Sequence, residues 1–228
     1  MTEPLQICLP VMMHKEAEVE AFQKAKERIE RLGESFPIRV GAFLYFLEQA
    51  LTPQNMEAGI ANQKKHRLPI VHCQAPVQGQ HSLVYTSADA KKFGKQGLLE
   101  TSVDYCAALR EYSSLDYPAA VDVHSGVYVF QDLQDDGSLP SFFSVNSFIK
   151  RRGELLTTAK DRFQQLTEYA RGRGLGFVLE NEISAALCPS KYSNGEPKMH
   201  FMPFTARDAM NFIAGESQTF DTAHYGAS

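Results

Sequence analysis

Short apolar runs alternate with longer amphipathic segments along most of this 228-residue chain. The first run spans residues 5–11. In the segment that follows, residues 14–32, Ala17, Phe22 and Ile29 recur near helical spacing with charges between them. A strand followed by a helix, repeated along a chain, is typical of parallel β/α folds, because parallel strands need a crossover between them. We therefore predict an α/β fold built from parallel β/α units.

The alternation continues to the end of the sequence. Thr52 followed by Pro53 predicts the start of the second helix, since threonine caps helices and proline is tolerated at the first helical position. A long loop is expected after the fourth strand. The later strands are expected at residues 38–46, 68–73, 119–124, 175–179 and 218–220, and the later helices at residues 53–66, 97–112, 147–171 and 205–213. We therefore expect about six β/α units in a single domain spanning residues 1–228.

The composition narrows the class of protein. With 43% apolar and 22% charged residues, the chain has enough apolar side chains for a sizeable core. The formal net charge of -4 gives no global electrostatic argument for nucleic acid, so such a partner is not indicated, although a local basic groove would be compatible with it. No stretch approaches the ~18 apolar residues of a membrane span, and the N-terminus does not resemble a signal peptide. We expect a cytoplasmic protein with no membrane association.

The four cysteines, Cys8, Cys73, Cys106 and Cys188, lie far apart in the sequence and include no CxxC pair. This spacing suggests neither a zinc knuckle nor a disulfide framework. We interpret them as reduced thiols, most of them buried.

Polar side chains that suit metal binding follow the predicted strands. They are His72, His124, Glu180, Asp221 and His224. One histidine at a strand end is more often a hydrogen-bonded structural residue, but five such groups at equivalent positions favour a site, because the carboxyl ends of parallel strands converge. Imidazole and carboxylate together predict a divalent ion, with Zn²⁺, Mn²⁺ or Fe²⁺ favoured over Mg²⁺.

The segments around these residues resemble a known family. VHCQAP contains His72, DVHSG contains His124, LENE contains Glu180, and FDTAH ends at His224. In order and in one-per-strand placement they are similar to the strand-three to strand-six motifs of the xylose isomerase-like superfamily, which includes the sugar phosphate isomerases and epimerases and apurinic endonuclease IV. The resemblance implies a (β/α)8 TIM barrel. It is an incomplete one, because strands seven and eight have no counterpart here.

The resemblance also implies roles for these side chains. Glu180 and Asp221 would bind a catalytic divalent ion, and Glu180 would also act as the proton-transfer base of the isomerase branch. His72, His124 and His224 match positions that bind further metal in the endonuclease branch. The remaining ligands of the family come from strands seven and eight.

Three functions remain open at this stage. The leading hypothesis is a metal-dependent isomerase or epimerase with a small-molecule sugar substrate. The second is a metal-dependent phosphodiesterase of the endonuclease IV kind, although Glu180 is followed by Asn-Glu-Ile-Ser rather than that branch's Asn-Thr-Ala-Gly. The third is a non-catalytic barrel fragment. An open barrel exposes edge strands and apolar side chains. We therefore expect a longer protein, completion by another subunit as in a homo-oligomer, or marginal stability.

Overall fold

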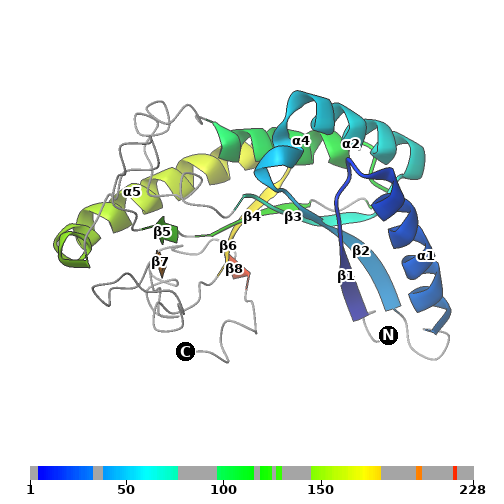
Figure 1. Ribbon diagram of the computed structural model, residues 1–228, viewed down its shortest axis with the longest axis horizontal. Helices are drawn as coiled ribbons and strands as arrows, with labels where there is room; N and C mark the ends of the chain where they lie inside the picture. The colour runs from blue at the N-terminus through cyan, green and yellow to red at the C-terminus, as the bar shows by residue number, and fades with distance from the viewer. Residues whose placement is uncertain are drawn as a thin grey trace. The chain divides into compact units, whose positions relative to one another are not determined.

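The structure of the chain is a computed structural model that describes residues 5–32, 38–76, 97–115, 119–124, 127–129, 145–180, 199–201 and 218–219. Strands and helices alternate along these residues (Figure 1). The strands are β1 (Leu5–Val11), β2 (Ile38–Tyr45), β3 (Ile70–Gln74), β4 (Ala120–His124), β5 (Val127–Val129), β6 (Gly176–Glu180), β7 (Met199–Phe201) and β8 (Gln218–Thr219). The helices are α1 (Glu16–Leu32), η2 (Glu48–Leu51), α2 (Pro53–His66), α4 (Leu98–Arg110) and α5 (Val145–Arg171).

Within the described part of the chain, the main sheet has the strand order β1-β2-β3-β4-β6-β8. The pairs β1–β2, β2–β3, β3–β4 and β6–β8 are parallel. Strands that follow one another along the sheet in sequence order, with helices between them, have the arrangement of a β/α barrel. The prediction of an α/β fold made of parallel β/α units is therefore confirmed. As expected for the first and last strands, β1 and β8 stand at the ends of this order.

The sequence analysis missed one feature of the sheet structure. The predicted long loop after β4 contains β5, which pairs antiparallel with β7. The helix after it, α5, begins at Val145, two residues earlier than predicted. The predicted helix at residues 205–213 lies outside the described residues.

The chain divides into two compact units, which we describe separately. The first comprises residues 1–76, 98–122 and 169–177, and the second comprises residues 77–97, 123–168 and 178–228. In the second unit, Ala159, Phe163 and Leu166 of α5 are buried at near-helical spacing. This pattern confirms the amphipathic helix predicted there.

In the first unit, one face of the sheet is covered by helices. Leu44 of β2 pairs with Cys73 of β3, and the Sγ atom of Cys73 lies 2.7 Å from that of Cys106 in α4. Register partners in parallel strands share a face, so Leu44 and Cys73 both point toward the helices. Phe43 and Tyr45 then lie on the opposite face, and both are less buried than Leu44.

Helix α2 has the start predicted for it and a specific end. The Thr52 side chain accepts a hydrogen bond from the backbone N–H of Asn55, which caps the first turn. At the other end Arg67 adopts a left-handed conformation, with φ of 51°. The buried Gln63 side chain then bridges the turn, because its amide donates to the Leu68 carbonyl and its carbonyl accepts from the Leu68 N–H. These contacts lead the chain from α2 into β3.

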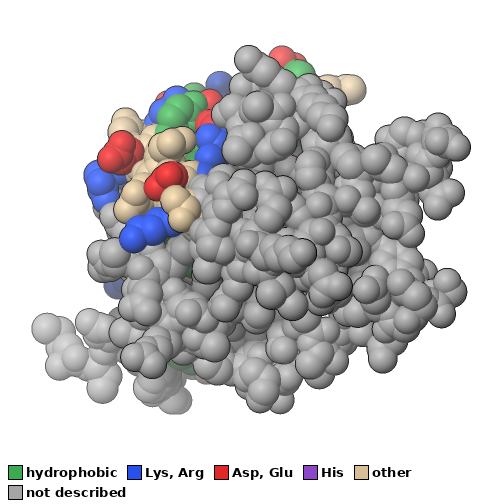
Figure 2. Space-filling view, turned by 90° about the vertical axis from the view of Figure 1, so that its left-hand side faces the viewer, with side chains coloured by type: hydrophobic (Ala, Val, Ile, Leu, Met, Phe, Trp, Pro, Cys, Tyr) green, Lys and Arg blue, Asp and Glu red, His purple; other side chains and the backbone are tan. Residues whose placement is uncertain are grey.

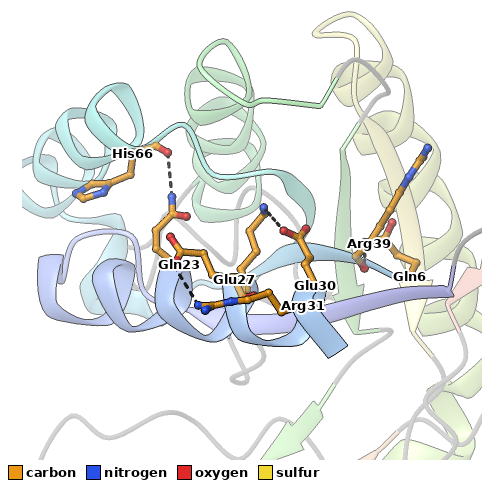
Figure 3. A network of polar contacts seen from close by, with 8 residues as sticks. Gln6, Gln23, Glu27, Glu30, Arg31, Arg39 and His66 are labelled. Atoms are coloured by element: carbon orange, nitrogen blue, oxygen red, sulfur yellow. Dashed lines mark hydrogen bonds and ion pairs between the residues drawn. The ribbon is translucent and has the colours of Figure 1, made fainter. Parts of the chain in front are cut away.

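A side chain of helix α1 is hydrogen-bonded to the last residue of α2. Figure 3 shows Gln23 of α1 reaching the backbone of His66, with its Nε2 atom 3.1 Å from the His66 carbonyl oxygen. Nearby, Asn62 of α2 donates to the Met13 carbonyl over 2.8 Å. Polar side chains therefore join two helices whose apolar faces pack on the sheet.

None of the described helices is long and apolar enough to cross a membrane. Of the three cysteines among the described residues, Cys73 and Cys106 are buried and Cys8 is exposed. The expectation of buried thiols is thus correct for two of the three, and Cys188 lies outside the described residues.

Candidate active site

The centre of the candidate site in the first unit is a contact between His72 of β3 and Asp122 of β4. The Nε2 atom of His72 lies 3.1 Å from Oδ2 of Asp122. The Asp122 side chain is 3% exposed and that of His72 is 17% exposed. A carboxylate is therefore held in the interior with an imidazole as its neighbour.

A β-bulge gives His72 its orientation. Ala42 of β2 pairs with Ile70, but the next residue, Phe43, pairs with His72, so Val71 is an extra residue on β3. Without the bulge, the period of two would place Ile70 and His72 on the same face of the sheet. Ile70 is buried, whereas Val71 and His72 are less buried. The extra residue thus moves the imidazole to the face opposite the helices.

Register places Asp122 on the same face. Gln74 of β3 pairs with Asp122, and His72 pairs with Ala120 two residues earlier. Asp122 therefore lies diagonally across from His72, and long side chains in neighbouring strands reach each other at this separation. Phe43 of β2 completes the surroundings, with its ring centroid 5.3 Å from that of His72. Apolar packing and a carboxylate together hold the imidazole.

The structure places the predicted site residues as follows. His72 was predicted at the end of its strand. β3 continues to Gln74, however, so His72 lies two residues before the end. His124 is the last residue of β4, and Glu180 is the last residue of β6 and pairs with Thr219. The side chains of His124 and Glu180 are not among those described, and Asp221 and His224 lie outside the described residues. Their roles remain predictions.

The described residues contain no group of three or more His, Cys, Asp or Glu side chains that could hold a metal ion. They do offer one imidazole whose second nitrogen is separate from the Asp122 contact. Metal-binding histidines commonly donate their other nitrogen's proton to a carboxylate. The His72–Asp122 pair has the composition of such an arrangement, so its chemistry fits a divalent ion of the Zn²⁺, Mn²⁺ or Fe²⁺ type.

Sequence analysis missed Asp122. The signal was present, because a charged residue interrupts the apolar strand Ala-Val-Asp-Val-His two positions before His124. A buried charge in a strand needs a partner, so its position argues for one. The identity of that partner depends on the register between β3 and β4, which the sequence does not display.

Comparison with known proteins rests on structure alone. No protein-family model matches the chain, and no curated protein matches its sequence. The chain superposes on D-allulose 3-epimerase from Methylomonas sp. with a TM-score of 0.57 and 14% identity, covering 100% of this chain and 66% of that one. The chain therefore shares the β/α barrel fold of this epimerase over the part that superposes. The predicted barrel of parallel β/α units is confirmed at the level of fold.

Two further structures agree with this barrel. A D-tagatose 3-epimerase-like protein matches with a TM-score of 0.50 and 14% identity, over 98% of this chain and 66% of that one. A protein from Thermus thermophilus, soaked with ZnCl2, matches with a TM-score of 0.50 and 16% identity, over 97% of this chain and 68% of that one. The chain therefore spans about two thirds of the length of the epimerase barrels it resembles.

Charge on the described surface is mixed. On the face shown in Figure 2, Lys and Arg side chains lie next to Asp and Glu side chains in the coloured region. A phosphate-binding groove needs cations gathered without neutralising carboxylates. The described part of this face does not have that distribution.

Proposed function

We propose that this protein is a divalent-metal-dependent isomerase or epimerase that acts on a sugar or sugar derivative. The observation that carries the proposal is the His72–Asp122 pair, a buried carboxylate and an imidazole 3.1 Å apart, set on neighbouring parallel strands. The epimerase barrels that share the fold support the substrate class.

The metal ligands in this proposal are those predicted from the sequence. They are His72, His124, Glu180, Asp221 and His224. When bound, a divalent ion would act as a Lewis acid on the substrate carbonyl and hydroxyl. An imidazole among the ligands favours Zn²⁺, Mn²⁺ or Fe²⁺ over Mg²⁺, and a protein of the same fold has been soaked with ZnCl2.

Glu180 is the proposed base. A carboxylate next to the substrate would remove the proton from the carbon beside the carbonyl, and a proton would then be delivered to that carbon or to the former carbonyl carbon. Delivery to the opposite face of the same carbon, by an acid on that face, is epimerisation. Delivery to the former carbonyl carbon, with the hydroxyl proton passing to the former carbonyl oxygen, is isomerisation. Both reactions begin with loss of the same proton.

The proposed substrate is a small polyol with a carbonyl group. The Methylomonas epimerase of this fold forms a complex with D-allulose, a ketose. Because the ligand of that enzyme is a free sugar and the sequence resemblance includes the sugar phosphate isomerases and epimerases, both ketoses and ketose phosphates should be tested.

Deuterium exchange tests the proposal directly. The chain is incubated in D2O with Zn²⁺, Mn²⁺ or Fe²⁺ and a panel of ketoses and ketose phosphates, and loss of the proton next to the carbonyl is followed by ¹H NMR. We expect metal-dependent exchange with at least one substrate. Glu180→Gln should reduce the rate by about 10²–10⁴-fold with little change in the fold, because the amide cannot accept the proton.

Gln23→Glu serves as the matched control, because it replaces an amide with a carboxylate on α1, an element that carries none of the predicted ligands. It should leave the exchange rate unchanged. Absence of exchange with every metal and sugar, or full activity of Glu180→Gln, would overturn the proposal. Two or three tightly bound ions together with cleavage of a phosphodiester would instead support the endonuclease IV-like function.

A further inference from the structure

We propose that Gly41 of β2 is a positioning residue for His72. The space that its missing side chain leaves is filled by Val71, and this keeps the His72 ring beside Phe43 on the face of the sheet away from the helices. The importance of that place for metal binding rests on the proposed function. The packing that creates it involves only described residues of this chain.

Two consecutive residues of β3, Val71 and His72, have side chains on the same face of the sheet. Side chains alternate along a regular strand, so Gly41 and Phe43 of β2 share a face. A Cβ added to Gly41 would collide with Cγ2 of Val71, and the Phe43 ring centroid lies 5.3 Å from that of His72. Both β3 side chains therefore lie on the face that Gly41 and Phe43 share, and the alternation is broken at the bulge.

This face therefore has to hold one side chain more than a regular strand would place there. In a regular register Val71 would pair with Phe43, but the bulge gives that place to His72. Val71 lies instead against Gly41, which is buried. Glycine inside a strand is typical of a bulge or of a close approach by another group, because it has no side chain to displace. The empty volume at Gly41 thus gives Val71 a place that does not compete with the imidazole.

Val71 is the neighbour that resists a larger residue at position 41. Valine is branched at Cβ, which restricts its χ1 rotamers, and its own Cβ would lie 3.3 Å from the added one. Nε2 of Gln6 would lie 2.8 Å from the added Cβ, but it is the end of a flexible side chain. Figure 3 shows Gln6 next to Arg39, whose carbonyl accepts a hydrogen bond from that Nε2 over 3.4 Å. Because Gln6 can move aside, alanine at position 41 should push Val71 toward Phe43 and displace the His72 ring.

The place of the ring can be read from metal-free protein by ¹H NMR. His72→Gln identifies the His72 ring signals among those of the seven histidines. The Phe43 ring shifts these signals and gives nuclear Overhauser effects to them, because the two rings are in contact. In Gly41→Ala we expect the His72 signals to move and the Overhauser effects to Phe43 to weaken.

A second substitution separates positioning from a simple loss of stability. Val71→Ala removes Cγ2, the atom with which the added Cβ would collide. In a Val71→Ala background, Gly41→Ala should therefore move the His72 signals much less than it does in the wild type, since residues in contact couple and distant ones do not. A role of Gly41 in overall stability alone would leave the two shifts equal.

Gly59→Ala is the matched control. It adds the same methyl group to α2 of the same unit, where the new Cβ would collide with the Tyr105 hydroxyl oxygen. We expect it to lower stability and to leave the His72 signals in place.

Unchanged His72 signals in folded Gly41→Ala, or an equal change in the Val71→Ala background, would overturn the inference. If Gly41→Ala does not fold, the double variant should fold, since it lacks the collision. Failure of both variants to fold would also overturn it.

Deuterium exchange with the metal-loaded protein gives an independent readout. If the proposed function holds, Gly41→Ala should reduce the exchange rate by about 10²-fold, the loss that a displacement of ~1 Å can cause, and the double variant should regain most of it. The two proposals fail separately. A His72 ring that moves as expected in a protein without exchange would overturn the function alone, and exchange with unchanged His72 signals in Gly41→Ala would overturn the role of Gly41 alone.

Discussion

The Sγ atom of Cys73 in β3 lies 2.7 Å from the Sγ atom of Cys106 in α4, and both side chains are completely buried. Cys73 is the neighbour of His72, so this contact packs α4 against the strand that carries the candidate site. Burial raises the pKa of the Cys73 thiol, and a buried protonated thiol is unreactive.

Thiol labelling should therefore distinguish the cysteines. In the native protein we expect Cys8, which is exposed, to react with iodoacetamide well before Cys73 and Cys106. The two buried thiols should react only after unfolding in guanidinium. Peptide mass spectrometry identifies each modified residue. Native labelling of Cys73 at the rate of Cys8 would contradict the packing described for β3 and α4.

Gly59→Ala should destabilise the first unit. Gly59 of α2 lies against the Tyr105 side chain of α4, and an added Cβ would collide with the Tyr105 hydroxyl oxygen and approach its Cζ atom to 3.0 Å. Alanine gains up to ~1 kcal/mol of helix propensity, but overpacking costs about 1–3 kcal/mol, so we expect a net loss in the free energy of unfolding measured in urea. Adding Tyr105→Phe should restore part of the loss. Equal or higher stability of Gly59→Ala would show that the contact is absent.

Because Tyr105 is buried, we expect the free energy of unfolding to depend on pH in the alkaline range. Burial raises its pKa above the ordinary value of 10.0, with the Cys73 thiol as an ionisable neighbour. The folded state holds the Tyr105 hydroxyl proton more tightly than the unfolded state does. The stability that the protonated hydroxyl contributes is therefore complete below pH 10 and is lost as pH rises above it. The free energy of unfolding should fall less steeply above about pH 10 in Tyr105→Phe than in the wild type. Parallel curves for the two proteins would contradict this.

Gln63→Leu should lower the free energy of unfolding by more than its small change in side-chain volume suggests. The Gln63 side chain makes two buried hydrogen bonds to the backbone of Leu68, of 3.0 and 3.1 Å. Its loss would leave a buried N–H and a buried carbonyl unpaired, at a cost of about 2–4 kcal/mol in chemical denaturation. Gln23→Leu removes one partly buried hydrogen bond, to His66, and should cost less than half as much. Similar losses in the two variants would argue against the bridging role of Gln63.

Local patterns predicted most of the secondary structure. β1 spans the predicted residues 5–11, and α2 begins at Pro53 after the Thr52 cap. These features depend on residues that are close together in the sequence, where periodicity and capping are visible. β5 was missed because it is three residues long and its partner, β7, lies far along the chain.

Part of the candidate site could likewise be predicted from the sequence, and part of it could not. Residue types and their places after apolar runs were enough to single out His72, and the alternation of strands and helices was enough to predict the parallel sheet that carries it. The bulge at Val71 and the pairing of Gln74 with Asp122 were not predictable, because both depend on the register between strands from different β/α units. Register is set by packing across the whole sheet, since a shift of one residue moves every side chain to the other face. The neighbour of His72 is therefore a property of the folded sheet.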